Sequence, residues 1–500
     1  MQTAPLPVRS QPSASSVGST DEALVGAYRM PGRRTRLGLT LALPLWLLSA
    51  CGGSEESPAP TGTPVPTQVP AVTYYRDVKP ILDRVCANCH VEGGVAPSTF
   101  EGYEQASARS ATIASYVSSG YMPPKAADPS CNDYVYSERM TITDDERQIL
   151  QSWHELGAPA GDPATQTAVE PGPGHLAQVD MSLRLPSVHY PTFDESGNQY
   201  ACYVVDDVRS ETLFVSGLEA FIDKAEIVHH VVLYKGTGGA TDDLTDPTQG
   251  WDCMDGNGGE WEMVAAWAPG NGPLVFPEGA ALRVDPEDKL VVQMHYFKSR
   301  EGAETVGDKS GYDLTLVDSA ETELLMAGMG TDDFMIPAGD TNYSASAEVV
   351  NELTGLSLEL YGVFPHMHVL GKRYDYELEA QNGAKTCLAG GQRDFHNQAN
   401  YLWKQTAMFD PGETIRFTCT WDNSAGNPGQ LNNPPVDVSY GERTQEEMCF
   451  GFTWVAVVRT GSEGGRETLS GNEAESVLSS AGMRRTGFLG AHSGMPLEMP

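Results

Sequence analysis

The segment Cys86-Ala87-Asn88-Cys89-His90 constrains the fold more than any other stretch of this chain. Two thiols three residues apart on a helical turn can each add to a vinyl group of a haem, and the adjacent histidine can then bind the iron from one face. A disulfide or half of a zinc site is the alternative interpretation, but the segment contains no second Cys or His pair. The motif therefore predicts one covalently attached haem c, held by Cys86 and Cys89, with His90 as an axial ligand.

The residues around this motif predict a small helical domain over 73–162. Apolar residues recur at helical spacing over 74–84, immediately before the motif. A second helix is expected over 143–157, where Thr143 and Glu146 form a capping box ahead of one apolar face.

A methionine sulfur is expected as the second axial ligand of the haem iron. Met122 lies in the proline-rich loop 120–124, and a His/Met ligand pair raises the reduction potential of a haem. Met140 is also available. With these features, residues 73–162 resemble a small class I cytochrome c, which implies an all-α domain.

The first residues of the chain indicate export. Arg33, Arg34 and Arg36 precede an apolar run over 37–50 that is too short to span a membrane, as in a secretion signal. Leu48-Ser49-Ala50-Cys51 resembles the cleavage box of a bacterial lipoprotein, in which the cysteine is lipidated.

We therefore expect a signal region over 1–50, with Met30 as an alternative start, and lipidation at Cys51. Residues 51–72 are rich in Ser, Thr and Pro and are expected to form a disordered tether. The mature protein is expected to be lipid-anchored to a bacterial membrane, facing the periplasm or the cell surface.

The charge of the chain argues against nucleic acid as a partner. The sequence has 32 Lys and Arg against 67 Asp and Glu, a formal net charge of −35. A protein that binds a polyanion needs the opposite sign. We expect no nucleic-acid partner, and a monomer.

The region from about 180 to 460 predicts β-structure. Short apolar or alternating runs are separated by Gly, Pro and Asp, as in antiparallel sandwiches. This length is too great for one sandwich and fits two, expected over 175–320 and 321–460. Residues 461–500 lose this periodicity and are expected to be a disordered tail.

Three histidine placements stand out in the β-rich region. The adjacent pair His229 and His230 cannot face one side of a regular strand, so it requires a strand end or a bulge. His295 lies in another apolar run. His366 and His368 are two residues apart, so on a strand they would share a face and could bind one metal.

The identity of the metal depends on further ligands. A set of histidines suits zinc, copper or iron, whereas a thioether favours copper, especially Cu(I). Met448, at the start of the apolar run 450–458, offers such a sulfur. A lone histidine in a strand is usually only a core polar group, so the prediction rests on the combination.

These motifs occur in a fixed order along the chain. They are His229-His230-Val231-Val232-Leu233, Trp267-Ala268-Pro269-Gly270, Phe276-Pro277-Glu278-Gly279, Gln293-Met294-His295-Tyr296, His366-Met367-His368-Val369-Leu370-Gly371-Lys372 and Glu446-Glu447-Met448-Cys449. In this order they resemble the copper type II, ascorbate-dependent monooxygenases, the family of peptidylglycine α-hydroxylating monooxygenase and dopamine β-hydroxylase.

The resemblance covers about 180–460 and implies a fold, two cofactors and a reaction. The implied fold is a pair of jelly-roll sandwiches with one copper on each, facing across a solvent-filled cleft. The implied reaction is hydroxylation of a C–H bond of a small molecule with O2, with electrons from ascorbate or a periplasmic donor. The implied ligands are His229, His230 and His295 for an electron-transfer copper, and His366, His368 and Met448 for the catalytic, O2-activating copper.

The resemblance also implies two disulfides, Cys202 with Cys253 and Cys419 with Cys449. Cys131 and Cys387 are left over. They could pair across domains or stay free.

Two positions depart from the peptide-amidating member of the family, which has an arginine and a tyrosine where this chain has Phe364 and Phe452. A peptide carboxylate would lose its partners there, so we expect a neutral or hydrophobic substrate. His396 could lie near the second copper, although a structural role is the simpler interpretation. The alternative functions are a membrane-tethered haem c electron carrier and a non-catalytic copper-binding protein.

Overall fold

The structure of the chain is a computed structural model, and it describes residues 72–485. The residues within this span that it does not describe are 88, 92–95, 97, 168, 170–174, 196, 207–208, 243–245, 247, 254–259, 270, 299–300, 396, 442, 461–465 and 481–483. The predictions about the signal region, Cys51, the tether and His396 fall outside the described residues. Among the described residues, no helix is both long enough and apolar enough to cross a membrane.

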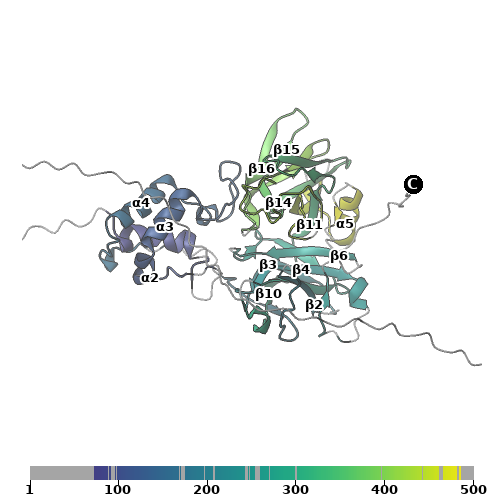
Figure 1. Ribbon diagram of the computed structural model, residues 1–500. Helices are drawn as coiled ribbons and strands as arrows, with labels where there is room; N and C mark the ends of the chain where they lie inside the picture. The colour runs from purple at the N-terminus through teal and green to yellow at the C-terminus, as the bar shows by residue number, and fades with distance from the viewer. Residues whose placement is uncertain are drawn as a thin grey trace, which may run out of the picture. The chain divides into compact units, whose positions relative to one another are not determined.

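The first described part of the chain is helical (Figure 1). Its elements are η1 (Tyr74–Val78), α1 (Lys79–Ile81), η2 (Leu82–Cys86), α2 (Tyr103–Ala108), α3 (Ser110–Ser119), η3 (Ser137–Arg139), α4 (Asp144–Glu155) and η4 (Pro163–Thr165). Tyr74 and Trp153 lie fully buried at the centre of its core. The expected capping box begins α4, because the backbone N–H of Glu146 donates to Thr143 Oγ1 and that of Thr143 donates to the Glu146 carboxylate.

Two packed sheets follow and enclose a first core. Their strands are β1 (Met181–Arg184), β2 (Asn198–Asp206), β3 (Leu213–Phe221), β4 (Val228–Thr237), β5 (Trp251–Asp252), β6 (Glu260–Trp267), β7 (Leu274–Val275), β8 (Ala280–Val284), β9 (Lys289–Phe297) and β10 (Gly311–Val317), with short helical turns η5 (Gly239–Asp242) and η6 (Ala303–Thr305). One sheet has the order β5-β2-β9-β4-β6, and the other contains β1-β10-β3-β8. Buried side chains from both sheets form the first core.

A second pair of sheets encloses a second core. Its strands are β11 (Thr322–Gly330), β12 (Met335–Ile336), β13 (Tyr343–Val350), β14 (Leu356–His366), β15 (Gly371–Glu379), β16 (Lys385–Gln392), β17 (Tyr401–Phe409), β18 (Thr414–Trp421), β19 (Val438–Ser439), β20 (Phe450–Thr460), β21 (Arg466–Thr468) and β22 (Arg484–Arg485). The order β13-β18-β15-β16 forms one layer, and β11-β20-β14-β17 forms the layer that packs on it. This β-structure agrees with the expected sandwiches.

The two sandwiches share one sheet. β8 pairs in parallel with β11, with Thr322 opposite Ala280 and Leu324 opposite Leu282, so a single eleven-stranded sheet passes from the first sandwich into the second. The sequence did not predict this pairing, because nothing in either strand marks its neighbour.

Strands β14 and β20 are apolar on both faces because each face of their sheet lies in a different core. On β20, Val455 and Val457 belong to the second core, whereas Phe452 and Trp454 belong to the first. A strand buried on both sides has no alternation of apolar and polar residues, which explains the continuous apolar run there.

The expectation of a disordered tail over 461–500 is wrong for part of that range. Helix α5 (Gly471–Ser480) follows β21, and Leu469, Ala474 and Leu478 are buried in the second core. The sequence does not predict this helix, because its few apolar positions are separated by Gly, Asn, Ser and Glu.

All six cysteines of the described β-rich region and its preceding loop are paired. The disulfides Cys202–Cys253 and Cys419–Cys449 are those that the resemblance implied. The third, Cys131–Cys387, answers the question that the sequence left open, and it joins residues 256 positions apart.

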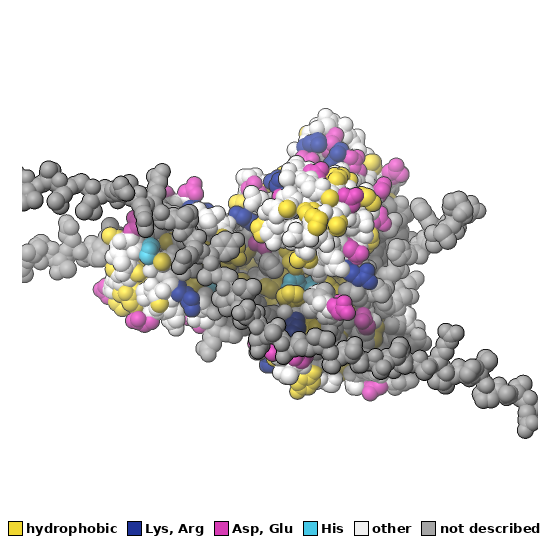
Figure 2. All heavy atoms as spheres, in the orientation of Figure 1, with side chains coloured by type: hydrophobic (Ala, Val, Ile, Leu, Met, Phe, Trp, Pro, Cys, Tyr) yellow, Lys and Arg dark blue, Asp and Glu magenta, His cyan; other side chains and the backbone are white. Residues whose placement is uncertain are grey.

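In Figure 2 acidic and basic side chains are interspersed over the face in view.

Candidate metal and haem sites

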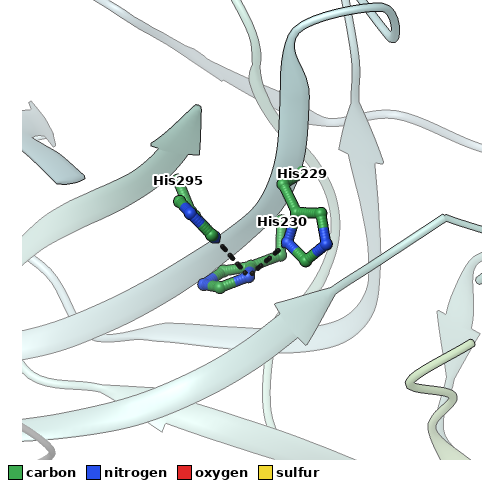
Figure 3. A group of neighbouring side chains, drawn as sticks. All are labelled: His229, His230 and His295. Carbon is green, nitrogen blue, oxygen red and sulfur yellow. Dashed lines mark hydrogen bonds between the residues drawn. The ribbon is translucent and has the colours of Figure 1, made fainter. Parts of the chain in front are cut away.

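Three histidine side chains converge at one end of the first sandwich (Figure 3). The ligand nitrogens of His229, His230 and His295 lie within 4.8 Å of one another. His230 Nδ1 is 3.3 Å from His229 Nδ1 and 3.2 Å from His295 Nδ1. Three imidazole nitrogens at this spacing suit a transition metal such as copper or zinc.

A bulge brings the adjacent histidines to one point, as their sequence required. Val228 pairs with Tyr296 and His230 pairs with His295, so the β4–β9 register shifts at His229. This irregularity lets both neighbouring imidazoles reach the same side of the sheet.

The first group has its own supporting contacts. Asn198 Oδ1 lies 2.7 Å from His295 Nε2, so the Nε2–H group donates a hydrogen bond to the amide oxygen. The other ring nitrogen, Nδ1, is then left to bind a metal. Tyr200 stacks on the His295 ring, with centroids 4.2 Å apart. Burial lowers the pKa of His230 and of His295 well below the ordinary value, which keeps both imidazoles neutral.

The second set of ligand candidates lies where β14 ends and β20 begins. His366 is the last residue of β14, and His368 lies in the following turn rather than on the strand. The two rings are 5.2 Å apart, while Met367 between them is fully buried in the second core. Met448 is buried just before β20, beside the Cys419–Cys449 disulfide.

In both histidines of this set, Nδ1 lies within hydrogen-bonding distance of an oxygen atom. His366 Nδ1 lies 2.8 Å from Gln398 Oε1, and His368 Nδ1 lies 3.0 Å from the Glu446 carbonyl oxygen. If each Nδ1–H donates to that oxygen, each Nε2 is left to bind a metal. Burial lowers the pKa of His368 to about 4, so this imidazole is neutral at pH 7.

Glu447 is hydrogen-bonded both to the turn that carries His368 and to the segment that carries Met448. Its buried carboxylate accepts hydrogen bonds from the backbone N–H groups of His368, Leu370 and Met448 and from the Trp421 indole. Burial is the larger effect on Glu447 and raises its pKa to about 7, while the hydrogen bonds to the carboxylate offset part of this rise. The turn that carries His368 and the segment that carries Met448 are therefore fixed by one side chain.

Both sets meet at one cavity of about 70 Å³. Its walls include His230 from the first set and His366, His368 and Met448 from the second. This volume holds a few water molecules at most. The resemblance implied a solvent-filled cleft between the two copper sites, and this cavity is lined by members of both sets.

The wall beside the second set is apolar. Phe364 lines the cavity and stacks on Phe452, its cross-strand partner, with centroids 6.1 Å apart. Phe450 stacks on Phe452 in turn at 5.9 Å. No charged group stands at either of the positions where the sequence departs from the peptide-amidating pattern.

The helical domain holds its motif in a form that fits a haem. Cys86 and Cys89 are free thiols, which removes the disulfide alternative for this pair. His90 Nδ1 lies 2.7 Å from the Ser98 carbonyl oxygen, which leaves Nε2 to bind iron, and its ring stacks on Phe100 at 4.2 Å. Met122 and Met140 both line the same cavity as these residues, so each places a thioether at this site.

Sequence reasoning missed three residues around the metal sites: Asn198, Gln398 and Glu447. Asn198 and Gln398 are brought next to the histidines by strand pairing and loop packing, which no local sequence pattern reveals. Glu447 had a signal, since a carboxylate directly before a buried candidate ligand must find hydrogen-bond donors in the same core.

Comparison with known proteins gives one family match. Residues 181–303 match the family model for the N-terminal domain of copper type II ascorbate-dependent monooxygenases. This range contains His229, His230 and His295 and ends before His366, so it supports a copper-dependent monooxygenase domain in the first sandwich.

Solved structures with some likeness come from infectious bursal disease virus. The structure of the Gt strain is 11% identical, with 62% of this chain and 81% of that chain covered, at a TM-score of 0.14. The crystal structure of the T13 viral particle is 9% identical, with 55% and 75% covered, also at 0.14. At such TM-scores these likenesses say nothing about fold or function.

Proposed function

We propose that this protein is a copper-dependent monooxygenase that hydroxylates a C–H bond of a small molecule with O2. One copper would be held by His229, His230 and His295, and a second by His366, His368 and Met448. The observation that carries the proposal is the single cavity lined by His230 from the first set and by all three members of the second.

The two donor sets fit different tasks. The first offers three imidazole nitrogens, which accommodate both oxidation states of copper and suit electron transfer. The second replaces one nitrogen with the soft thioether of Met448, which favours Cu(I). When bound, the coppers supply O2 activation and one electron each.

The residues around the second set support an apolar substrate. Phe364 and Phe452 form a stacked wall next to His366, and Phe364 lines the cavity. A substrate carboxylate at this wall would be desolvated without a partner, which is costly. We therefore propose a neutral or hydrophobic substrate.

We also propose that the helical domain supplies electrons through a covalent haem. Cys86 and Cys89 would hold it, His90 would be one axial ligand, and Met122 is our choice for the other. Each haem carries one electron at a time, and each turnover requires two. A periplasmic donor, or ascorbate, would reload the haem. Export and lipidation at Cys51 remain part of this proposal and would place the enzyme at a bacterial membrane.

The first experiment is the copper-to-iron ratio of full-length protein matured with haem. We expect about two copper ions per iron, falling to about one in His366→Ala, because the first set does not depend on that side chain. Iron with negligible copper would contradict the monooxygenase and leave the electron carrier. Two coppers without substrate-dependent O2 consumption, across a panel of apolar compounds, would favour the non-catalytic copper protein.

A further inference from the structure

A cavity of about 1040 Å³ joins the haem attachment motif to the first metal group. One wall is formed by residues of the helical domain, including Cys86, Cys89 and His90. Residues of the first sandwich, including His229 and Phe297, also line the cavity. A haem bound to the motif would therefore be enclosed by residues of both.

His229 belongs to both sites. Its Nδ1 lies 3.3 Å from His230 Nδ1 in the metal group, while the residue also lines the haem cavity. One imidazole thus borders the metal site and the haem cavity together. A conjugated ring that borders both sites is a candidate route for an electron between them.

A strap of the helical domain, residues 125–135, lies along the second sandwich. Its backbone makes strand-like hydrogen bonds: Asp128 N–H donates to the Gly390 carbonyl at 2.7 Å, and Val135 N–H donates to the Leu402 carbonyl at 2.8 Å. Tyr134 forms a bridge with Trp403 between these points. The strap is therefore docked on β16 and β17 along most of its length.

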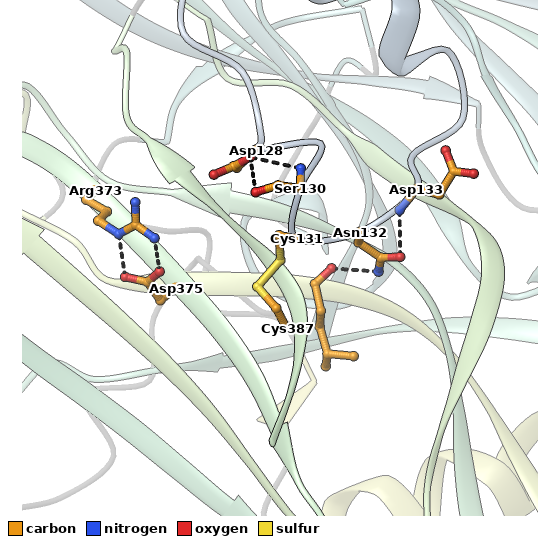
Figure 4. Close-up of a disulfide and its surroundings, with 9 residues drawn as sticks. Asp128, Ser130, Cys131, Asn132, Asp133, Arg373, Asp375 and Cys387 are labelled. Carbon is orange, nitrogen blue, oxygen red and sulfur yellow. Dashed lines mark hydrogen bonds and ion pairs between the residues drawn. A yellow bond between two sulfur atoms is a disulfide. The ribbon is translucent and has the colours of Figure 1, made fainter. Parts of the chain in front are cut away.

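A disulfide fastens the strap at its middle (Figure 4). Cys131 is bonded to Cys387 of β16, and the Asn132 side-chain amide next to it donates to the Leu388 carbonyl at 2.8 Å. Met122 precedes the strap and Met140 follows it, so both candidate iron ligands are attached to the fastened segment.

We infer that residues of the sandwich domains complete the haem site. We also infer that the site is kept closed by the Cys131–Cys387 disulfide and the adjacent Asn132 hydrogen bond, here called the clamp. This inference rests on the proposed haem and copper centres. With both cofactors bound, His229 would be the copper ligand that borders the haem cavity. One electron would pass from ferrous haem to cupric ion, leaving ferric haem and cuprous ion, with no bond formed or broken.

The clamp can be tested without copper. The full-length, haem-loaded protein, before copper is added, is reduced and then oxidised by ferricyanide in a stopped-flow instrument. We expect the rate constant to rise severalfold in the Cys131→Ser/Cys387→Ser variant, because the sandwich wall no longer covers the haem. Ser130→Ala is the matched control, since its hydroxyl bonds only within the strap, to Asp128, and its rate should equal wild type. Equal rates in all three proteins overturn the inference.

A second measurement addresses electron entry. After copper loading, the haem is reduced under anaerobic conditions and its reoxidation by cupric ion is followed. We expect transfer that is independent of protein concentration in the wild type and severalfold slower in the double-serine variant. Absence of transfer in the wild type would contradict the proposed haem supply, whereas the ferricyanide rates would still decide whether the wall and its clamp exist.

Retention of the haem spectrum and of the thermal unfolding midpoint checks that the variants are folded. If the double-serine variant is not recovered folded, Asn132→Ala removes the neighbouring hydrogen bond to Leu388 and should raise the ferricyanide rate by a smaller factor. An unchanged rate in that variant overturns the inference equally.

Discussion

His230 and His295 face each other across the β4–β9 pair, with their Nδ1 atoms 3.2 Å apart. Burial lowers the pKa of each well below the ordinary value, so neither carries a charge that could repel a cation. Two neutral nitrogens at this distance need a shared proton or a metal ion between them. The third nitrogen, from His229, makes the metal ion the better occupant.

Asn198→Ala should weaken copper binding at the first group by about 10–100-fold. The amide oxygen accepts from His295 Nε2 and so fixes which ring nitrogen faces the metal. Competition titration with a copper chelator measures the affinity. Asn382→Ala, in an exposed hairpin turn, is the control and should bind copper as the wild type does. Equal affinity in both variants would remove Asn198 from the site.

Met448→Leu should abolish the sulfur ligand while keeping the fold, because the two side chains have similar volume. X-ray absorption of the Cu(I) protein should then lose its sulfur scattering. Met367→Leu is the matched control, since Met367 is equally buried but belongs to the second core. Sulfur scattering that persists in Met448→Leu would reassign the ligand.

Glu447→Gln should lower the free energy of unfolding by about 1–3 kcal/mol and should reduce copper binding at the second set. A glutamine has one acceptor oxygen where the carboxylate uses two to bind His368, Leu370 and Met448. Denaturant titration gives the stability and metal analysis gives the stoichiometry. A variant that loses stability but retains both coppers would limit Glu447 to a role in the fold.

Leu478→Ala should destabilise the second sandwich by about 2–5 kcal/mol, since it leaves a cavity where α5 packs. Ser476→Ala, at an exposed position of the same helix, should change stability little. Thermal unfolding of the two variants makes the comparison. Indistinguishable midpoints would show that α5 does not contribute to the core.

The sequence predicted the features whose causes are local. His229 and His230 are adjacent, so a bulge or strand end was unavoidable, and the structure has the bulge. The capping box of Thr143 and Glu146 was equally readable from residue spacing.

Features that depend on distant segments could not be predicted. The turn that places His368 is held by Glu447, and the partner of Cys131 lies 256 residues away. Contacts of this kind are selected by the packing of whole sheets, and a pattern within one strand carries no information about them.

The parallel pairing of β8 with β11 makes the two sandwiches one folding unit. A fragment ending at residue 320 would leave β8 with an unpaired edge in the middle of what should be a continuous sheet, and such an edge recruits other chains. Expression of either half alone should therefore give aggregates, and the intact pair should melt in a single transition. Evolution of a new substrate specificity in one half is correspondingly constrained, because the halves cannot be exchanged as independent modules.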